Sequence, residues 1–202
     1  MSRGKGIFSK LFFFILITFC FLPYAFCQSK DIEGQYFTIK IYPGCNLTEF
    51  AGKLNAKSLH HVDLLLKEAK DIEDIISQGV DALFLKACDI LDMHLYSYHG
   101  TIKLCPDIKS MHKVAFRDYS DKHYKPDAPA VYRHSHNTIY ISFSDFSVEM
   151  IGHEIAHVII SNYFAVVPPV KMQEILAGYV EFSLRKEAGT LYKNRGKPSS
   201  AK

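Results

Sequence analysis

The sequence predicts an α+β fold in which a small mixed sheet packs on helices. Two kinds of periodicity recur along its 202 residues. Alternating, β-rich stretches such as "QYFTIKIY" (35–42) and "NTIYIS" (137–142) predict strands, whereas apolar residues at helical spacing predict helices. Hydrophobic residues make up 48% of the chain and charged residues 22%, which is an ordinary globular balance. A chain of this length is enough for one domain with a real core.

The N-terminal segment reads as a secretory signal peptide. "MSRGKGIFSK" is basic, an uncharged apolar run follows from Leu11 to Leu22, and Ala25 and Cys27 are small residues at a cleavage site before Gln28. We therefore expect a signal peptide at 1–27, a single folded domain at 28–189 and a basic, disordered tail at 190–202. The mature protein would be periplasmic or secreted, without a membrane span. The alternative is an uncleaved signal that anchors the protein, because no charge interrupts the segment from Leu11 to Ser29.

The charge of the chain gives no indication of a nucleic-acid partner. The formal net charge is +3, and Arg3, Lys5 and Lys10 of the signal segment supply all of it. The mature body is therefore close to neutral and lacks the excess of basic residues that nucleic-acid binding requires.

The first half of the mature chain alternates strands and helices. The strand at 35–42 ends at "PG", and Asn46 is a suitable N-cap for a helix over 47–55. Apolar residues at helical spacing from about His61 to Leu95 predict two helices that Gly79 separates. "GTIKLCP" (100–106) is a second short strand, and because helices join it to the first strand, we expect the two to be parallel.

The second half supplies a hairpin and two helices. A polar segment holds one short helix around 110–117, after which "PAVYRH" and "NTIYIS" form two strands around the turn "SHN". A helix is expected from about Ser147 to Tyr163. A last helix covers Val170 to Glu187, since Pro168 and Pro169 are typical of a helix start and Gly189 of a helix end.

The motif "HEIAH" lies inside the first of these two helices. His153 and His157 are four residues apart and so share one helix face, with Glu154 beside them. This is the HExxH signature of zinc metallopeptidases, in which two imidazoles one turn apart bind one ion and the glutamate holds the water. The flanking residues are apolar nearly all round the helix, so uncompensated histidines and a carboxylate there would be costly to bury. A chance occurrence of the motif remains the competing interpretation.

Together with "KMQEILAGYVEF", the motif resembles the gluzincin metallopeptidases, the group of thermolysin-like and aminopeptidase N-like enzymes. In that group a glutamate on the helix after HExxH is the third ligand. The resemblance covers roughly Val131 to Glu187 and implies a zincin-like core, an HExxH helix followed by a ligand helix, and Zn²⁺ as the cofactor. It also implies that "NTIYIS" is the edge strand that holds an extended substrate. No histidine follows His157, which disfavours the metzincin class.

Two glutamates of the last helix compete for the place of third ligand. Glu174 precedes Ala177 and Gly178, whose small side chains would allow close packing against the HExxH helix. Glu181 lies four residues before Arg185, the spacing of an ordinary surface ion pair. The two carboxylates differ in height by about 10 Å, so one ion cannot reach both. We expect Glu174 to be the ligand.

Three interpretations of function follow from these residues. The first is an exported zinc metallopeptidase that hydrolyses a peptide or protein substrate, with His153, His157 and Glu174 on the metal and Glu154 as general base. The second is a non-catalytic zinc- or peptide-binding module on a peptidase scaffold. The third is a structural exported domain in which the motif is accidental and no metal binds.

Cysteine usage allows at most one internal disulfide in the mature chain. Cys45, Cys88 and Cys105 remain after the signal segment, an odd number, and no CxxC motif is present. Cys45 and Cys105 both follow the C-terminal ends of strands expected to be parallel, so a Cys45–Cys105 bridge is predicted. Cys88 lies on the apolar stripe of a helix and is expected to be a buried thiol.

Overall fold

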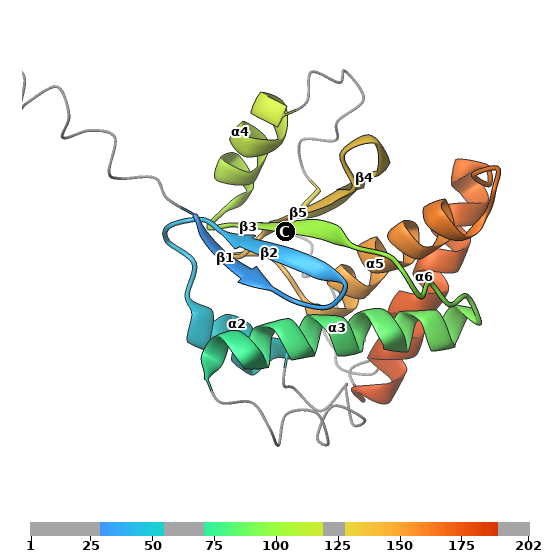
Figure 1. The fold of residues 1–202 in the computed structure, drawn as a ribbon, viewed down its shortest axis with the longest axis horizontal. Helices are drawn as coiled ribbons and strands as arrows, with labels where there is room; N and C mark the ends of the chain where they lie inside the picture. Colours follow the sequence, from blue (N-terminus) through green and yellow to red (C-terminus); the bar gives the residue numbers. More distant parts are fainter. Residues whose placement is uncertain (1–28, 55–70, 119–127, 190–202) are drawn as a thin grey trace, which may run out of the picture.

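The computed structural model describes residues 29–54, 71–118 and 128–189, which form a five-stranded mixed sheet with helices on both faces (Figure 1). The strand order is β1-β2-β3-β5-β4. The three inner strands, β2, β3 and β5, are parallel, and each outer strand is antiparallel to its neighbour. The α+β class is therefore confirmed. The strands are β1 (Lys30–Glu33), β2 (Phe37–Ile41), β3 (Gly100–Cys105), β4 (Ala130–Arg133) and β5 (Thr138–Ser142).

The parallel pairing of the first two predicted strands is confirmed, but β1 was not predicted. In register, Ile39 of β2 lies opposite Ile102 of β3. The sequence of β1 is "KDIE", in which Ile32 alone is buried. Such a strand has too little apolar alternation to be recognised, because it is an outer strand that contributes one side chain to the core.

The strand "NTIYIS" was wrongly expected to be the sheet edge. It forms β5, which lies between β3 and β4, and all five residues of β5 are buried. The preceding strand β4 is the edge strand on this side of the sheet, and β1 is the edge strand on the other. A turn at η5 (His134–His136) folds β4 back on β5, which leaves β4 on the outside next to the HExxH helix.

The break expected at Gly79 is also wrong. Helix α3 (Ile72–Leu91) continues through this position. An added Cβ at Gly79 would lie 3.2 Å from Cβ of Leu54, so the glycine allows α2 (Leu47–Leu54) to pack closely against α3. The cap of α2 is confirmed, since Asn46 Oδ1 accepts hydrogen bonds from the backbone N–H groups of Thr48 and Glu49. The helix expected from about His61 falls mainly in 55–70, outside the described residues.

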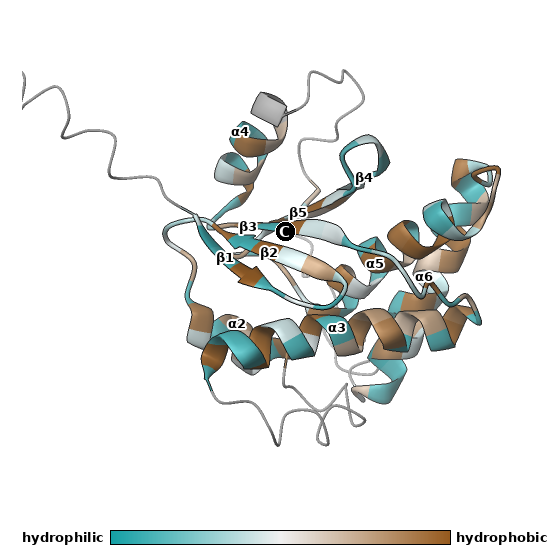
Figure 2. Ribbon diagram, in the orientation of Figure 1, coloured by the Kyte–Doolittle hydropathy of each residue, from teal (hydrophilic) through white to brown (hydrophobic). Residues whose placement is uncertain are grey.

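The sheet separates two apolar clusters. Alternate residues of β5 point to opposite faces: Ile139 and Ile141 belong to the large cluster with α2, α3, α5 and α6, and Tyr140 to the small one under α4 (Ile108–Asp118). Hydrophilic and apolar residues alternate along α3, as expected for a helix with one face on the core (Figure 2). Among the described residues, no helix is long and apolar enough to cross a membrane.

The same alternation rules out the predicted disulfide. Cys105 lies in the small cluster under α4, whereas Cys45 packs against the large cluster on the other side of the sheet. Cys45 follows the end of β2 as expected and Cys105 is the last residue of β3, but their side chains lie on opposite faces. Cys45, Cys88 and Cys105 are all free thiols, and Cys88 is buried as predicted.

The last two helices have the bounds that their periodicity predicts. Helix α5 (Val148–Tyr163) begins at the N-cap Ser147, whose Oγ accepts a hydrogen bond from Met150 N. Helix α6 (Val170–Glu187) packs against α5 and buries Ala177, Val180 and Leu184. Its opposite face carries exposed apolar side chains, namely Met172, Ile175, Tyr179 and Phe182.

Candidate metal centre

Helix α5 presents the two motif histidines toward α6. Their rings are 5.0 Å apart between centroids, and the side chains are 20% and 14% exposed for His153 and His157. The Nε2 atoms lie 3.2 Å apart. Burial, together with the neighbouring His153, lowers the pKa of His157. A lowered pKa favours the neutral imidazole, which is the form that binds metal ions.

Helix α6 brings Glu174 to the same point. One carboxylate oxygen of Glu174 is 3.5 Å from Nε2 of His153, and the other is 3.7 Å from Nε2 of His157. One ligand atom from each of the three residues can be chosen so that all lie within 4.8 Å of one another. The three residues come from two helices that the short segment 164–169 connects.

These distances agree with the requirements of a small tetrahedral ion. At bond lengths of about 2.0–2.1 Å, neighbouring ligand atoms of a regular tetrahedron are about 3.3–3.4 Å apart. The shortest contacts of 3.2, 3.5 and 3.7 Å are close to that value, the last two being made by different oxygens of Glu174, and one ligand atom from each residue can be chosen within 4.8 Å of the others. Two imidazoles and one carboxylate are also a donor set that zinc accepts in catalytic sites, with the fourth position open. Glu174 is 57% exposed, so its carboxylate is in contact with solvent.

Glu154 follows His153 on α5 and contacts the edge strand β4. Its Oε2 accepts a hydrogen bond of 2.7 Å from the backbone N–H of Tyr132 in β4. Burial raises the pKa of Glu154 to about 7, and the nearby Glu174 and Glu181 add to this rise, while His153 and the Tyr132 N–H oppose it. A carboxyl with a pKa near neutrality can both accept and release a proton under physiological conditions.

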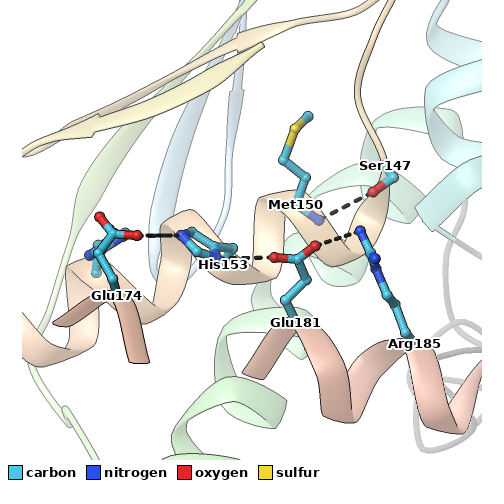
Figure 3. Close-up of polar contacts among 7 residues, drawn as sticks. Ser147, Met150, His153, Glu174, Glu181 and Arg185 are labelled. Atoms are coloured by element: carbon cyan, nitrogen blue, oxygen red, sulfur yellow. Dashed lines mark hydrogen bonds and ion pairs between the residues drawn. The ribbon is translucent and has the colours of Figure 1, made fainter. Parts of the chain in front are cut away.

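Glu181 makes a second contact in addition to the predicted surface ion pair. The pair with Arg185 is present at 2.5 Å, as the i+4 spacing indicates. In addition, the second carboxylate oxygen of Glu181 lies 3.1 Å from Nδ1 of His153 (Figure 3). The predicted ion pair is therefore confirmed, and the contact with His153 is one that the sequence did not predict. Because α6 runs antiparallel to α5, Glu174 and Glu181 both face α5, and they reach opposite nitrogens of the same ring.

The small residues that allow this approach are not all the predicted ones. Ala177 is buried against α5 as expected, but a Cβ added at Gly178 would meet nothing within 4 Å. The close contact is made by Gly152 of α5, where an added Cβ would lie 2.3 Å from Cδ1 of Leu184. Of the two small residues in this contact, Ala177 was predicted and Gly152 was not.

The hairpin before α5 contributes a further polar group that the sequence reasoning missed. The hydroxyl of Tyr132 lies 3.2 Å from Nδ1 of His134 and 3.4 Å from Nδ2 of Asn162. No sequence signal pointed to Tyr132, because its role depends on β4 being the edge strand. His134 and His136 are exposed on the turn, outside the three-residue cluster.

The geometry of the candidate metal centre is the basis for proposing a function, because known proteins provide none. No protein-family model, curated protein or solved structure matches the chain.

Proposed function

We propose that this chain is an exported zinc-dependent metallopeptidase of the gluzincin type, with His153, His157 and Glu174 as ligands and Glu154 as general base. The observation that carries the proposal is the convergence of both histidines of one HExxH helix with a glutamate of the next helix. The succession of a mixed sheet, an antiparallel edge strand and two antiparallel helices is compatible with a zincin-like core.

In the proposed reaction, the ion and the residues of the chain would have separate roles. A zinc ion held by these ligands would polarise the scissile carbonyl and lower the pKa of its water toward about 7. Glu154 would accept the proton of the attacking water and pass it to the leaving amine. The Tyr132 N–H, at 2.7 Å, keeps the Glu154 carboxylate oriented beside β4.

The substrate would be a peptide or protein segment in an extended conformation. Strand β4 is the outer strand next to α5, and an extended chain can bind along such an edge through backbone hydrogen bonds. The place for it is β4 rather than β5, which differs from what the resemblance alone implied.

Metal analysis is the experiment that tests the proposal. The purified mature protein should carry about one zinc per chain, and His153→Ala, His157→Ala and Glu174→Ala should each lose it, because two remaining ligands hold zinc weakly. Glu187→Ala is the matched control, since Glu187 is an exposed glutamate of the same helix that pairs with Lys86 at 2.9 Å. Protein that takes up no zinc in the absence of chelators would overturn the proposal and favour an accidental motif.

A second variant separates a peptidase from a zinc-binding module. Glu154→Gln should keep zinc and lower the rate of peptide hydrolysis by about 10²–10⁴-fold, because an amide cannot accept the proton of the water. Unfolded casein is a suitable first substrate. Stoichiometric zinc in a wild-type protein that cleaves nothing would favour the non-catalytic module. Such a module needs a ligand that zinc can reach, and Glu174 is exposed.

A further inference from the structure

We propose that Glu181 is a positioning residue that keeps the proton of His153 on Nδ1. We also propose that Arg185, by binding one end of the side chain at position 181, determines which atom of that side chain faces Nδ1. The inference rests on the proposed zinc site and extends it to two residues that do not touch the ion. Three residues in series carry it, namely His153, Glu181 and Arg185 (Figure 3).

The two ring nitrogens of His153 face different partners. Nε2 faces His157 at 3.2 Å and Glu174 at 3.5 Å, whereas Nδ1 faces Glu181 at 3.1 Å. A neutral imidazole has one N–H donor and one acceptor nitrogen, and a carboxylate only accepts. Both nitrogens face a carboxylate, but Glu181 is the nearer at 3.1 Å against 3.5 Å for Glu174, so in the neutral ring its contact places the proton on Nδ1. The lone pair of Nε2 is then directed at the point where Glu174 and His157 converge, which is the form that a metal ligand needs.

Arg185 occupies the other oxygen of Glu181. Its Nη2 lies 2.5 Å from Oε1, while Oε2 makes the contact with His153. An arginine side chain has donors and no acceptor, so whatever faces it must accept. Glu181 is 27% exposed, about half the exposure of Glu174, so this contact is more sheltered than the ligand carboxylate.

This arrangement predicts opposite behaviour for two simple substitutions. Glu181→Ala removes the acceptor and leaves His153 free to take either tautomer. In Glu181→Gln the amide has one oxygen, which Arg185 attracts, so its NH₂ group faces Nδ1. Nδ1 must then accept, the proton moves to Nε2, and that proton competes with the metal. Glu181→Gln should therefore weaken zinc binding at least as much as Glu181→Ala. A role in packing alone would predict the reverse, because glutamine has the same shape as glutamate.

Zinc affinity by chelator competition is the first readout. Loss of the group that hydrogen-bonds the non-ligating nitrogen of a metal-bound histidine typically weakens metal binding by 10–100-fold. We expect a loss of this size for Glu181→Ala and an equal or larger one for Glu181→Gln. Adding Arg185→Ala to Glu181→Gln should recover affinity, because the amide can then turn its oxygen to Nδ1. Glu187→Ala should bind zinc like the wild type, since its carboxylate pairs with Lys86 away from His153.

The second readout needs no metal and no activity. In metal-free protein, ¹⁵N chemical shifts of the His153 ring should report the Nδ1–H tautomer in the wild type and the Nε2–H tautomer in Glu181→Gln. If the wild type binds no zinc, the proposed function fails, whatever the tautomer. If the wild type binds zinc but both Glu181 variants keep its affinity within twofold, or the double variant binds no better than Glu181→Gln, this inference is overturned and the zinc site stands.

Discussion

Three glutamates within two helices differ because each has a different set of neighbours. Glu154 is half-buried beside a peptide N–H, and its pKa is raised to about 7. Glu174 is the most exposed of the three and faces two imidazole Nε2 atoms. Glu181 is held between an arginine and an imidazole Nδ1. Residue type alone would make them equivalent, so the assignment of base, ligand and positioning residue depends on these contacts.

Cys45 should be an unreactive thiol. Burial raises its pKa to about 11, and the charge of Asp107 adds to the rise. At pH 8 a thiol with that pKa is about 0.1% thiolate, compared with about a quarter for an ordinary cysteine, and the thiolate is the reactive form. Alkylation of native protein by iodoacetamide, followed by mass spectrometry, should show Cys45 reacting on the order of 100-fold more slowly than a free thiol.

Denaturation provides the control for this experiment. Without any reductant, the unfolded mature chain should take up label at Cys45, Cys88 and Cys105, since all three are free thiols. A cross-linked peptide that joins Cys45 to Cys105 would contradict the arrangement on opposite faces of the sheet.

At the scale of elements, the contact between α5 and α6 depends on Gly152. A Cβ at this position would lie 2.3 Å from Cδ1 of the fully buried Leu184. Overpacking of a core typically costs about 1–3 kcal/mol, which exceeds the gain of about 0.5–1 kcal/mol that alanine brings to a helix. Gly152→Ala should therefore lower the free energy of unfolding, measured by urea denaturation, by about 1–2 kcal/mol.

Two further variants isolate the contact. In a Leu184→Ala background the added methyl group has space, so Gly152→Ala should there be neutral or stabilising. Gly178→Ala of α6 is the matched glycine control, because its Cβ meets nothing within 4 Å, and it should stabilise the protein by about 0.5–1 kcal/mol. Equal effects of Gly152→Ala in both backgrounds would show that Leu184 is not the obstacle.

Periodicity predicted the elements around the site well because local residue patterns determine them. The bounds of α5 and α6 and the parallel pairing of β2 with β3 follow from apolar spacing, caps and a crossover connection. The sequence did not predict which strand is the edge, that α3 continues through Gly79, or that Glu181 reaches His153. Each of these depends on how elements distant in sequence pack, and no local pattern contains that information.

At the scale of the whole molecule, the candidate metal centre joins separate parts of the fold. His153 and His157 lie on α5, which packs against α3 and β4, and Glu174 lies on α6, the last helix. Glu154 is tied by the Tyr132 N–H to the outer strand of the sheet. An ion bound by these residues would therefore link α6 to α5, and α5 already contacts the sheet. Binding in the folded state and not in the unfolded chain stabilises the whole fold.

Zinc should consequently raise the unfolding temperature, and the size of the rise should depend on α6. At a free zinc concentration 100-fold above the dissociation constant, the expected stabilisation is about 2.7 kcal/mol, which corresponds to roughly 5–11 °C for a chain of this size. Differential scanning fluorimetry with and without chelator measures it. Glu174→Ala should lose the shift at the same zinc concentration, because the remaining histidines lie on α5 alone and no longer connect it to α6. Glu187→Ala, with its carboxylate on Lys86, should retain the shift. A rise of equal size in Glu174→Ala would mean that zinc binds elsewhere on the folded chain and that α6 contributes no ligand.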